Sequence, residues 1–201
     1  MTTCITTFSK DGYELYGHHM IQSWLQYWPA NFKLIVYTEG YSLAEKDERI
    51  VELDLETSCP DIVKFKNSSG NMLANTSNKK EQRRIQKTVK WCHKVYAIDN
   101  ALKIVNDYLI FLDGDTYTVN NVPFDLAEDL VNNGLLAVHF ENLKDGLHFE
   151  TGLIVFNTKH KQIELLKQLL TSGYNSLDIY SMNKTWDGFW LSHLYQKHNL
   201  D

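Results

Sequence analysis

Apolar and polar positions along the first forty residues follow the order expected of a strand, a helix and a second strand. The β-branched and apolar run Thr2–Phe8 predicts a buried strand. Apolar positions then recur roughly at helical spacing over residues 13–28, and Pro29 ends that segment. A second strand is predicted at Lys33–Thr38. This order predicts a parallel pair joined by a right-handed crossover.

In the middle of the chain, a segment with a weak secondary-structure signal lies between two segments with strong signals. A third short strand is expected at residues 50–55. The piece NSSGNMLANTSN is rich in Gly, Asn and Ser, and we interpret residues 67–80 as a mobile loop. Helical character returns over residues 79–105, with room for one break. The continuous apolar run YLIFL at Tyr108–Leu112 is then the best candidate for a central strand.

Strand and helix signals continue to alternate toward the C-terminus. We expect helices at residues 124–132, 159–170 and 188–197, and strands at residues 135–140 and 152–157. A chain of 201 residues with 43% hydrophobic and 22% charged residues fits one globular domain, residues 1–201. The predicted fold class is α/β, with a mostly parallel central sheet flanked by helices.

Charge and cysteine content limit the classes of partner and compartment. The formal net charge of −5 argues against coating nucleic acid with the whole surface, but it leaves room for a local basic groove. Three cysteines without CxxC spacing indicate neither a disulfide framework nor a zinc cluster. We find neither a signal peptide nor an apolar stretch of about 18 residues. A cytoplasmic protein without a membrane segment is expected.

An acidic pair, Asp113 and Asp115, follows the predicted central strand directly, with Gly114 between its members. Open α/β sheets bind ligands at the carboxyl ends of their strands. A turn containing glycine lets both carboxylates converge on one ion and lets the backbone approach a ligand. Two carboxylates with phosphate oxygens and water suit Mg²⁺ or Mn²⁺, which would neutralise a departing diphosphate. The alternative is a purely structural turn, since Asp-Gly-Asp is good turn chemistry.

Several segments in this order resemble the GT-A family of nucleotide-sugar glycosyltransferases. They are the βαβ start TCITTF and KLIVYTE, the strand with its acidic motif YLIFLDGD, the segment ETGLIVFN, and TWDGFW followed by a histidine. The likeness covers most of the chain and implies a GT-A fold and a nucleotide-diphosphate sugar as donor. It also implies that Asp113 and Asp115 bind the metal and the donor's ribose or diphosphate. The segment WCHKV is similar to one in small viral and phage-type members.

Basic residues precede the predicted central strand. Lys94, in WCHKV, is expected either to reach the donor's phosphates or ribose as a point charge or to be a solvated helix lysine. The run before it contains Lys79, Lys80, Arg83, Arg84, Lys87 and Lys90. Most such runs are solvated helix faces. Alternatively, this one borders the nucleotide site or binds a polyanionic acceptor such as DNA.

Two further carboxylates are candidates for catalysis. Glu150 opens the segment ETGLIVFN, where it could accept hydrogen bonds from sugar hydroxyls or simply be exposed at a strand start. Asp187, in TWDGFW, matches the position of a family acidic residue that acts as a base in inverting members. It could also be an N-cap of the last helix. Gly188 departs from the acidic doublet common at this place in the family.

Other residues of the C-terminal half were also considered. A family histidine often completes the metal shell, and we assign His198 in preference to His193, with water as the alternative. Trp186 and Trp190 either stack on a sugar or base or pack the last helix, and packing is favoured. The sequence KDG at residues 144–146 predicts a flexible turn that could close over substrate.

The expected activity is metal-dependent transfer of a sugar from a nucleotide-diphosphate sugar to a hydroxyl group. The cofactor is Mn²⁺ or Mg²⁺, and UDP-sugars are the expected donors because they are common in the resembled family. The phage-type likeness favours a hydroxymethylated pyrimidine in DNA as acceptor, and a saccharide or small molecule is the alternative. A non-catalytic nucleotide-sugar-binding module is a further alternative. A nucleotidyltransferase is disfavoured, because the first strand-to-helix loop, FSKDGYEL, lacks its Gly-rich basic signature.

Overall fold

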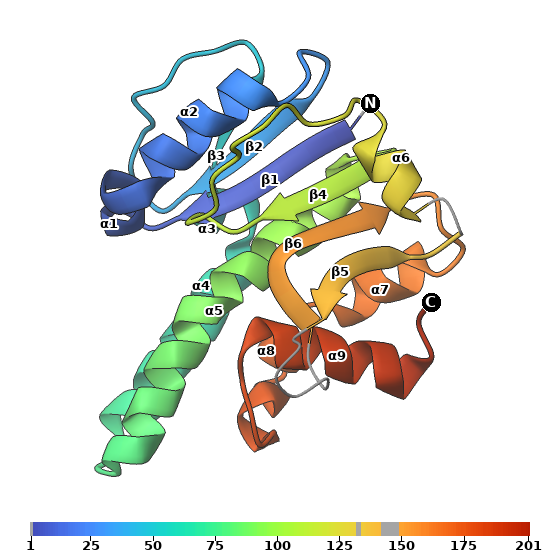
Figure 1. Cartoon of the computed structure of the whole chain (residues 1–201). Helices are drawn as coiled ribbons and strands as arrows, with labels where there is room; N and C mark the ends of the chain where they lie inside the picture. The colour runs from blue at the N-terminus through green and yellow to red at the C-terminus, as the bar shows by residue number, and fades with distance from the viewer. Residues whose placement is uncertain (1, 132–133, 142–148) are drawn as a thin grey trace.

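The strands of the protein form one sheet in the order β3-β2-β1-β4-β6-β5 (Figure 1). The computed structural model describes residues 2–131, 134–141 and 149–201. The strands are Thr2–Phe8 (β1), Lys33–Thr38 (β2), Ile50–Asp54 (β3), Tyr108–Leu112 (β4), Ala137–Glu141 (β5) and Phe149–Asn157 (β6). Strands β1 to β4 pair in parallel, whereas β6 is antiparallel to both β4 and β5. The predicted mostly parallel α/β sheet is confirmed, as are the six predicted strands.

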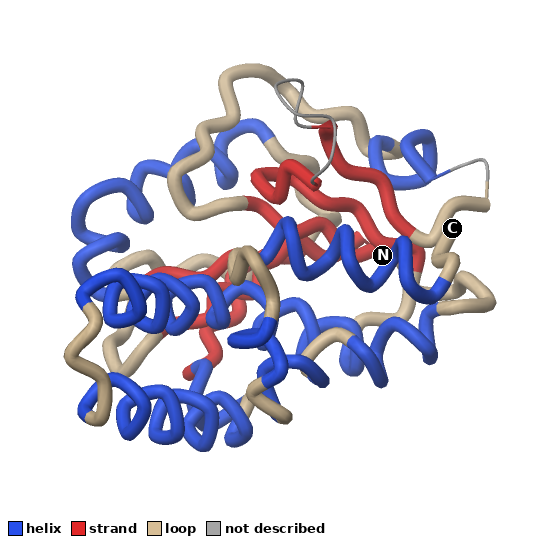
Figure 2. The backbone as a smooth tube through the Cα atoms, turned by 90° about the horizontal axis from the view of Figure 1, so that it is seen from below, coloured by secondary structure: helices blue, strands red, loops and turns tan. Residues whose placement is uncertain are grey.

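Helices lie against both faces of this sheet (Figure 2). They are α1 (Lys10–Gly12), the π-helix η1 (Tyr13–Gly17), α2 (His18–Tyr27), α3 (Leu55–Ser58), α4 (Pro60–Ala74), α5 (Lys79–Ile104), α6 (Leu126–Val131), α7 (Ile163–Leu169), α8 (Ser172–Asn175), the 3₁₀-helix η2 (Asp178–Ser181) and α9 (Asp187–His198). None of these helices is both long and apolar enough to cross a bilayer, within the part of the chain that the structure describes.

Alternate residues of the central strands enter two separate hydrophobic cores. Leu109 and Phe111 of β4 belong to the core that also contains buried side chains of α4, α5, α7 and α9. Ile110, between them, belongs to the core that contains buried side chains of α2 and α6. Successive side chains of a strand point to opposite faces, so a strand covered on both faces has to be apolar throughout. This explains the uninterrupted apolar sequence YLIFL.

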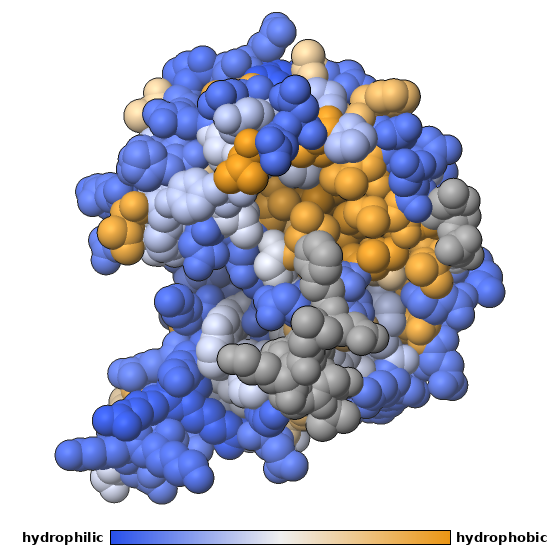
Figure 3. Space-filling view, in the orientation of Figure 1, coloured by the Kyte–Doolittle hydropathy of each residue, from blue (hydrophilic) through white to orange (hydrophobic). Residues whose placement is uncertain are grey.

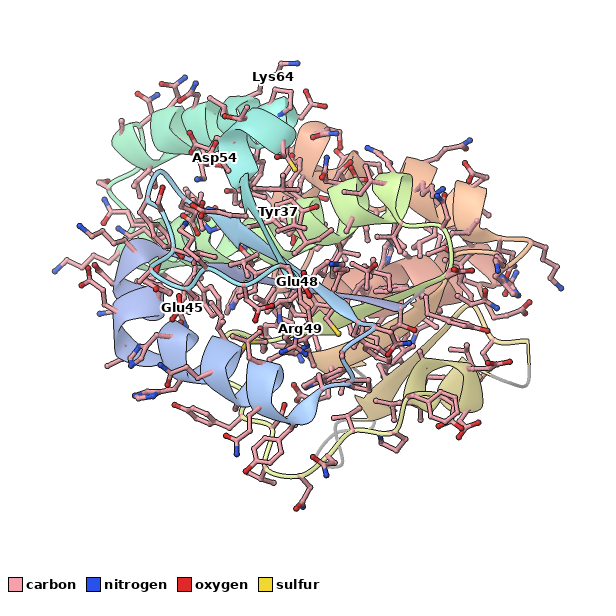
Figure 4. All side chains as sticks on the ribbon, turned by 90° about the horizontal axis from the view of Figure 1, so that it is seen from above. Tyr37, Glu45, Glu48, Arg49, Asp54 and Lys64 are labelled. Atoms are coloured by element: carbon pink, nitrogen blue, oxygen red, sulfur yellow. The ribbon has the colours of Figure 1, made fainter. Side chains whose placement is uncertain are left out.

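The connection between β2 and β3 is anchored by polar side chains, seen from above in Figure 4. Arg49 donates hydrogen bonds to the carbonyl oxygens of Leu25 (2.7 Å) and Trp28 (3.2 Å) at the end of α2. Asp54 accepts hydrogen bonds from the backbone amides of Thr57 (2.8 Å) and Gly40 (3.1 Å). These contacts satisfy free backbone groups at helix ends and hold the strand ends in place.

Helices α4 and α5 pack together and form an arm that projects from the sheet (Figure 1). The arm comprises α4 and residues 79–90 of α5. The prediction of a loop over residues 67–80 is therefore wrong for most of that range: α4 continues to Ala74 and α5 begins at Lys79. Ile62, Phe65 and Ser69 are buried at helical spacing, and the intervening polar residues conceal this period in the sequence. Tertiary packing on α5 outweighs the weak helix propensity of Asn, Ser and Gly.

The first predicted helix differs from expectation in its opening turns. Residues 13–17 form a π-helix rather than an α-helix. Leu15, one of the apolar residues at helical spacing in the segment predicted over residues 13–28, is 75% exposed. The wider turns of a π-helix shift the angular positions of its side chains, so a period of 3.6 residues misplaces this leucine. The helix predicted at residues 79–105 is confirmed as the unbroken α5.

Candidate active site

The candidate site lies where two adjacent parallel strands, β1 and β4, end. From β1 the chain continues through α2 to β2 on one side, and from β4 it continues to β5 and β6 on the other. Ligands of open α/β sheets bind at such a switch point, because the diverging connections leave a crevice beyond the carboxyl ends. Asp113 follows β4 directly, and Ser9 follows β1.

The turn at residues 113–116 directs the two predicted aspartates into this crevice. The carbonyl oxygen of Asp113 accepts hydrogen bonds from the backbone amide (3.1 Å) and the hydroxyl (2.7 Å) of Thr116. Its backbone amide donates to the carbonyl of Gly152 in β6 (2.8 Å). Asp113 is partly exposed and Asp115 is exposed. Both carboxylates are therefore accessible to a ligand.

Gly114 is required by packing beneath the turn. A β-carbon at this position would lie 2.7 Å and 2.8 Å from ring atoms of Phe8, and 3.3 Å from the ring of Tyr16. These separations are shorter than ordinary contacts between carbon atoms. Gly114 thus allows the rings of Phe8 and Tyr16 to pack directly beneath the turn. Its contact with a ligand stays a prediction.

Lys94 joins three parts of the site. Its ammonium group lies 2.9 Å from Oδ1 of Asp113 and 2.8 Å from Oδ2 of Asp187. It also donates to the hydroxyl of Thr151 (3.0 Å). Only 12% of the lysine side chain is exposed, so the interpretation as a solvated helix lysine is wrong. A cation enclosed in this way holds α5, the strand end of β4 and the start of α9 together.

The balance of charge at this point favours an added cation. Burial alone lowers the pKa of Lys94, but Asp187 and Asp113 outweigh burial and raise it. Burial raises the pKa of Asp113, and Lys94 reverses this only in part, because Asp187 and Asp115 act in the same direction as burial. One lysine thus contacts two aspartates, and Asp115 adds a further negative charge beside Asp113. The uncompensated negative charge is suited to a divalent ion or to donors of hydrogen bonds.

Asp187 occupies a different position from the expected helix cap. The helix α9 begins at Asp187 itself, and Trp186 is the N-cap residue, so the N-cap interpretation of Asp187 is wrong. The residue is 5% exposed, and its carboxylate accepts a hydrogen bond from the hydroxyl of Thr151 (2.7 Å). Thr151 and Lys94 orient this carboxylate toward the crevice, where it cannot also turn back to the helix amides.

Gly188 allows α9 to begin against the backbone of β6. A β-carbon there would lie 2.3 Å from the carbonyl oxygen of Phe149. Any larger residue would displace the start of the helix, and with it Asp187. The departure from an acidic doublet therefore has a steric cause.

These residues line one cleft of about 770 Å³. The cleft is visible in Figure 3 as a hollow in the molecular surface beside the arm. Glu150 is exposed within it, and Trp186 contributes an aromatic wall beside Trp91, with ring centroids 6.2 Å apart. Core packing is thus the role of Trp190, which is 5% exposed, but not of Trp186. A volume of this size is typical of sites for small molecules and cofactors.

Several residues of the cleft were not singled out in the sequence, among them Thr151, Tyr16 and Glu39. Thr151 bridges Lys94 and Asp187. Tyr16, on the π-helix, lines the cleft, and burial followed by the charges of Asp115 and Asp113 raises its pKa. Glu39 lies 2.7 Å from Nδ1 of His93, which also lines the cleft. A π-helical turn often marks a functional site, but its sequence carries no distinctive pattern.

His198 is not brought to the aspartates. It ends α9, whereas Asp187 begins that helix, so about 16 Å of helix axis separates them. Neither His198 nor His193 lines the cleft. Among the described residues, no group of three or more His, Cys, Asp and Glu side chains is placed to hold an ion. Asp113 and Asp115 still fit a magnesium-type site, which commonly uses one or two carboxylates together with substrate phosphates. The turn predicted at residues 144–146 lies outside the described residues.

Comparison with known proteins relates this architecture to glycosyltransferases. No protein-family model matches the sequence, and no curated protein matches it. The structure of mouse xyloside xylosyltransferase 1 superposes with a TM-score of 0.62 at 16% identity, covering 99% of this chain and 83% of that one. The galactosyltransferase LgtC, in complex with donor and acceptor sugar analogues, gives 0.54 at 15% identity, covering 96% and 70%. The glycosyltransferase GlyE of Streptococcus pneumoniae TIGR4 gives 0.56 at 13% identity, covering 98% and 43%. The chain has the fold of these GT-A glycosyltransferases.

Proposed function

We propose that this protein transfers a sugar from a nucleotide-diphosphate sugar, most simply a UDP-sugar, to a hydroxyl group of an acceptor. The observation that carries the proposal is the shared position of Asp113, Lys94 and Asp187 in one cleft at the switch point of the sheet. A turn that was only structural would not require a buried lysine between two carboxylates, because such an arrangement is costly to desolvate. Buried charges arranged in a cleft are typical of a functional site.

The donor would occupy the cleft with its diphosphate near Asp113 and Asp115. These two aspartates would hold Mn²⁺ or Mg²⁺ together with phosphate oxygens, and the ion would neutralise charge on the departing diphosphate. Lys94 supplies a fixed positive charge next to Asp113. Because it is enclosed, its interaction with an anionic or hydroxyl-bearing ligand would be weakly screened.

The reacting groups would meet between the diphosphate and Asp187. The acceptor oxygen forms a bond to the anomeric carbon while the bond from that carbon to the diphosphate oxygen breaks. The diphosphate leaves with the electron pair, and Asp187 takes the hydroxyl proton as general base. Thr151 and Lys94 hold the Asp187 carboxylate in place. The exposed Glu150 is assigned to hydrogen bonds with sugar hydroxyls.

Titration calorimetry with UDP and Mn²⁺ tests the donor site. The wild-type protein is expected to bind UDP only when the ion is present, and Asp115→Ala is expected to lose that dependence. Asp129→Ala removes an aspartate from α6 that does not line the cleft, and it should bind like the wild type. Absence of metal-dependent UDP binding in the wild type would contradict the proposal.

A screen of sugar nucleotides for slow hydrolysis then identifies the sugar and separates an enzyme from a binding module. Release of UDP from one donor, lost in Asp187→Asn, is the expected result. Binding of every donor without hydrolysis or transfer would instead favour the non-catalytic module. For the acceptor, a hydroxymethylated pyrimidine in DNA is the proposed class and a saccharide or small molecule the alternative.

A further inference from the structure

Positively charged side chains form a line along one face of α5. The helix turns by about 100° per residue, and on this geometry six cations fall within an arc of about 100°. They are Lys79, Lys80, Arg83, Lys87, Lys90 and Lys94. We call the first five the basic face. It runs along the arm, whose surface is hydrophilic (Figure 3), toward the cleft that Lys90 and Lys94 line.

The opposite side of the same helix is buried. Ile85, Thr88 and Cys92 are at most 1% exposed and point away from the basic face. Arg84 also belongs to this structural side, since it donates to the carbonyl oxygens of Tyr180 and Met182. The structure therefore separates Arg84, which supports the fold, from the five cations that face solvent.

The positive charges of the basic face are not balanced by ion pairs to other described residues. All five side chains are exposed, and none forms an ion pair within the described residues. Cations three or four residues apart on a helix repel one another by about 0.2–0.5 kcal/mol per pair. A face selected only for solubility mixes both signs of charge. Concentration of one sign here, in a protein of net charge −5, indicates a surface for a polyanion.

The chemistry at the end of the line indicates which polyanion fits. From Lys80 to Lys94, successive cations are about 4.5 to 6 Å apart along the helix axis, a spacing on the scale of single nucleotides. Where the basic face reaches the cleft, the rings of Trp91 and Trp186 meet edge to face. Proteins that bind single strands combine a positive track for the backbone with aromatic rings on which bases stack.

An anionic bilayer fits this surface less well. A helix that binds a membrane interface inserts large apolar side chains beside its cations. Residues 79–94 of α5 contribute no exposed large hydrophobic side chain. The line of cations also leads into a cleft, which a chain can enter and a bilayer cannot.

We propose that the basic face of α5 binds the phosphate backbone of a nucleic-acid strand and leads the strand into the cleft. The inference rests on the proposed function in one respect: the strand would carry the hydroxyl group that accepts the sugar. Binding of the strand itself is independent of donor chemistry.

Fluorescence anisotropy with a labelled single-stranded DNA of about 20 nucleotides, longer than a typical site of this kind, tests the proposal. Affinity is measured between about 50 and 200 mM salt, where phosphate contacts weaken steeply. The test variant is Arg83→Gln with Lys87→Gln, neither of which lines the cleft. The control is Lys46→Gln with Lys161→Gln, which removes the same charge from side chains that are 74% and 77% exposed elsewhere.

The wild type and the control should bind with the same salt dependence. The test variant should lose about tenfold in affinity, and its slope of log affinity against log salt should be shallower by about 1.4. Equal binding of test variant and control would overturn the proposal. So would equally tight, equally salt-dependent binding of heparin, polyglutamate or anionic phosphatidylserine vesicles, since the surface would then select charge alone.

Calorimetry with UDP and Mn²⁺ on the same variants separates this inference from the proposed function. The test variant is expected to keep the wild-type affinity for UDP. Loss of DNA binding with intact UDP binding supports a separate acceptor surface. DNA binding by a wild type that never binds UDP would refute the glycosyltransferase proposal and leave the nucleic-acid surface standing.

Discussion

The ammonium group of Lys94 lies 2.8 Å from Oδ2 of Asp187, and the same carboxylate oxygen accepts a hydrogen bond from Thr151. This pair connects the middle of α5 with the first residue of α9. Because Asp113 contacts the same ammonium group, a single cation organises the side chains assigned to the diphosphate and to the acceptor. The relationship makes the site sensitive to substitutions on elements far apart in the sequence.

Replacing Lys94 by Met should impair both stability and donor binding. The substitution keeps an unbranched side chain but leaves the partly exposed carboxylate of Asp113 and the buried carboxylate of Asp187 without their cation. Removing one partner of a buried ion pair costs about 3 kcal/mol or more. Urea unfolding at neutral pH measures the loss, and UDP titration measures binding. Lys94→Arg retains the charge and is the control; a Met variant as stable as the Arg variant would contradict this prediction.

Asp113→Asn should stabilise the protein at neutral pH while abolishing donor hydrolysis. The folded state raises the pKa of Asp113 above its ordinary value of 3.8, mainly through burial. The native state thus binds the Asp113 proton more readily than the unfolded state, and the resulting stability is present at low pH and lost as pH rises through the folded pKa. Asparagine resembles the protonated form.

The pH dependence of unfolding tests whether the folded state raises the pKa of Asp113. The difference in unfolding free energy between Asp113→Asn and the wild type should be largest near neutral pH and shrink toward zero as pH approaches 3.8. A gap that widened on acidification would show that Asp113 is stabilised as a carboxylate instead. Asp129→Asn, on the exposed surface of α6, controls for a general change in net charge.

Gly114→Ala should destabilise the protein through the aromatic rings beneath the acidic turn. Its β-carbon would lie 2.7 Å from the ring of Phe8, and overpacking of this kind costs about 1–3 kcal/mol. The matched control is Gly70→Ala on α4, where a β-carbon meets nothing within 4 Å. That change should be neutral or stabilising by about 0.5–1 kcal/mol. Thermal unfolding compares the two, and adding Phe8→Leu should relieve part of the Gly114→Ala defect.

Gly188→Ala should lower the rate of donor hydrolysis by more than a loss of folded protein alone would explain. The new β-carbon would overlap the backbone oxygen of Phe149 at 2.3 Å, which cannot move as a flexible side chain would. The start of α9 has to shift and carry Asp187 with it, and a displacement of about 1 Å can cost about 100-fold in rate. Donor hydrolysis is the measurement. Gly152→Ala is the control, because a β-carbon there stays 3.7 Å from Glu150; equal rates would contradict the prediction.

Several features of the fold followed from local pattern. The apolar run Tyr108–Leu112 predicted a strand covered on both faces, and β4 is buried in this way. The β-branched run Thr2–Phe8 and the crossover to Lys33–Thr38 predicted the parallel pair β1–β2, which the structure confirms. Both predictions succeeded because side-chain period and burial are local properties of a strand.

Other features could not be predicted from local pattern, because the residues that stabilise them are distant in sequence. The helix α4 is stabilised by packing of Ile62 and Phe65 in a core shared with α5, while its own composition suggested a loop. Ser69, within the segment expected to be mobile, contacts the hydroxyl of Tyr180 at 2.8 Å. Such contacts are absent from any window of adjacent residues, so propensity alone misassigned the segment.

The sequence by itself determined where the acidic turn begins: a strand that must be apolar on both faces ends at Leu112, and Asp113 and Asp115 follow it at the edge where parallel strands bind ligands. Only the tertiary structure decided which other side chains join them. It brought Lys94, Thr151 and Asp187 together from α5, β6 and α9, placed His198 at the far end of its helix, and assigned Arg84 to the fold rather than to the basic face. Periodicity is set by neighbouring residues along the chain, whereas convergence of charges is set by how whole elements pack.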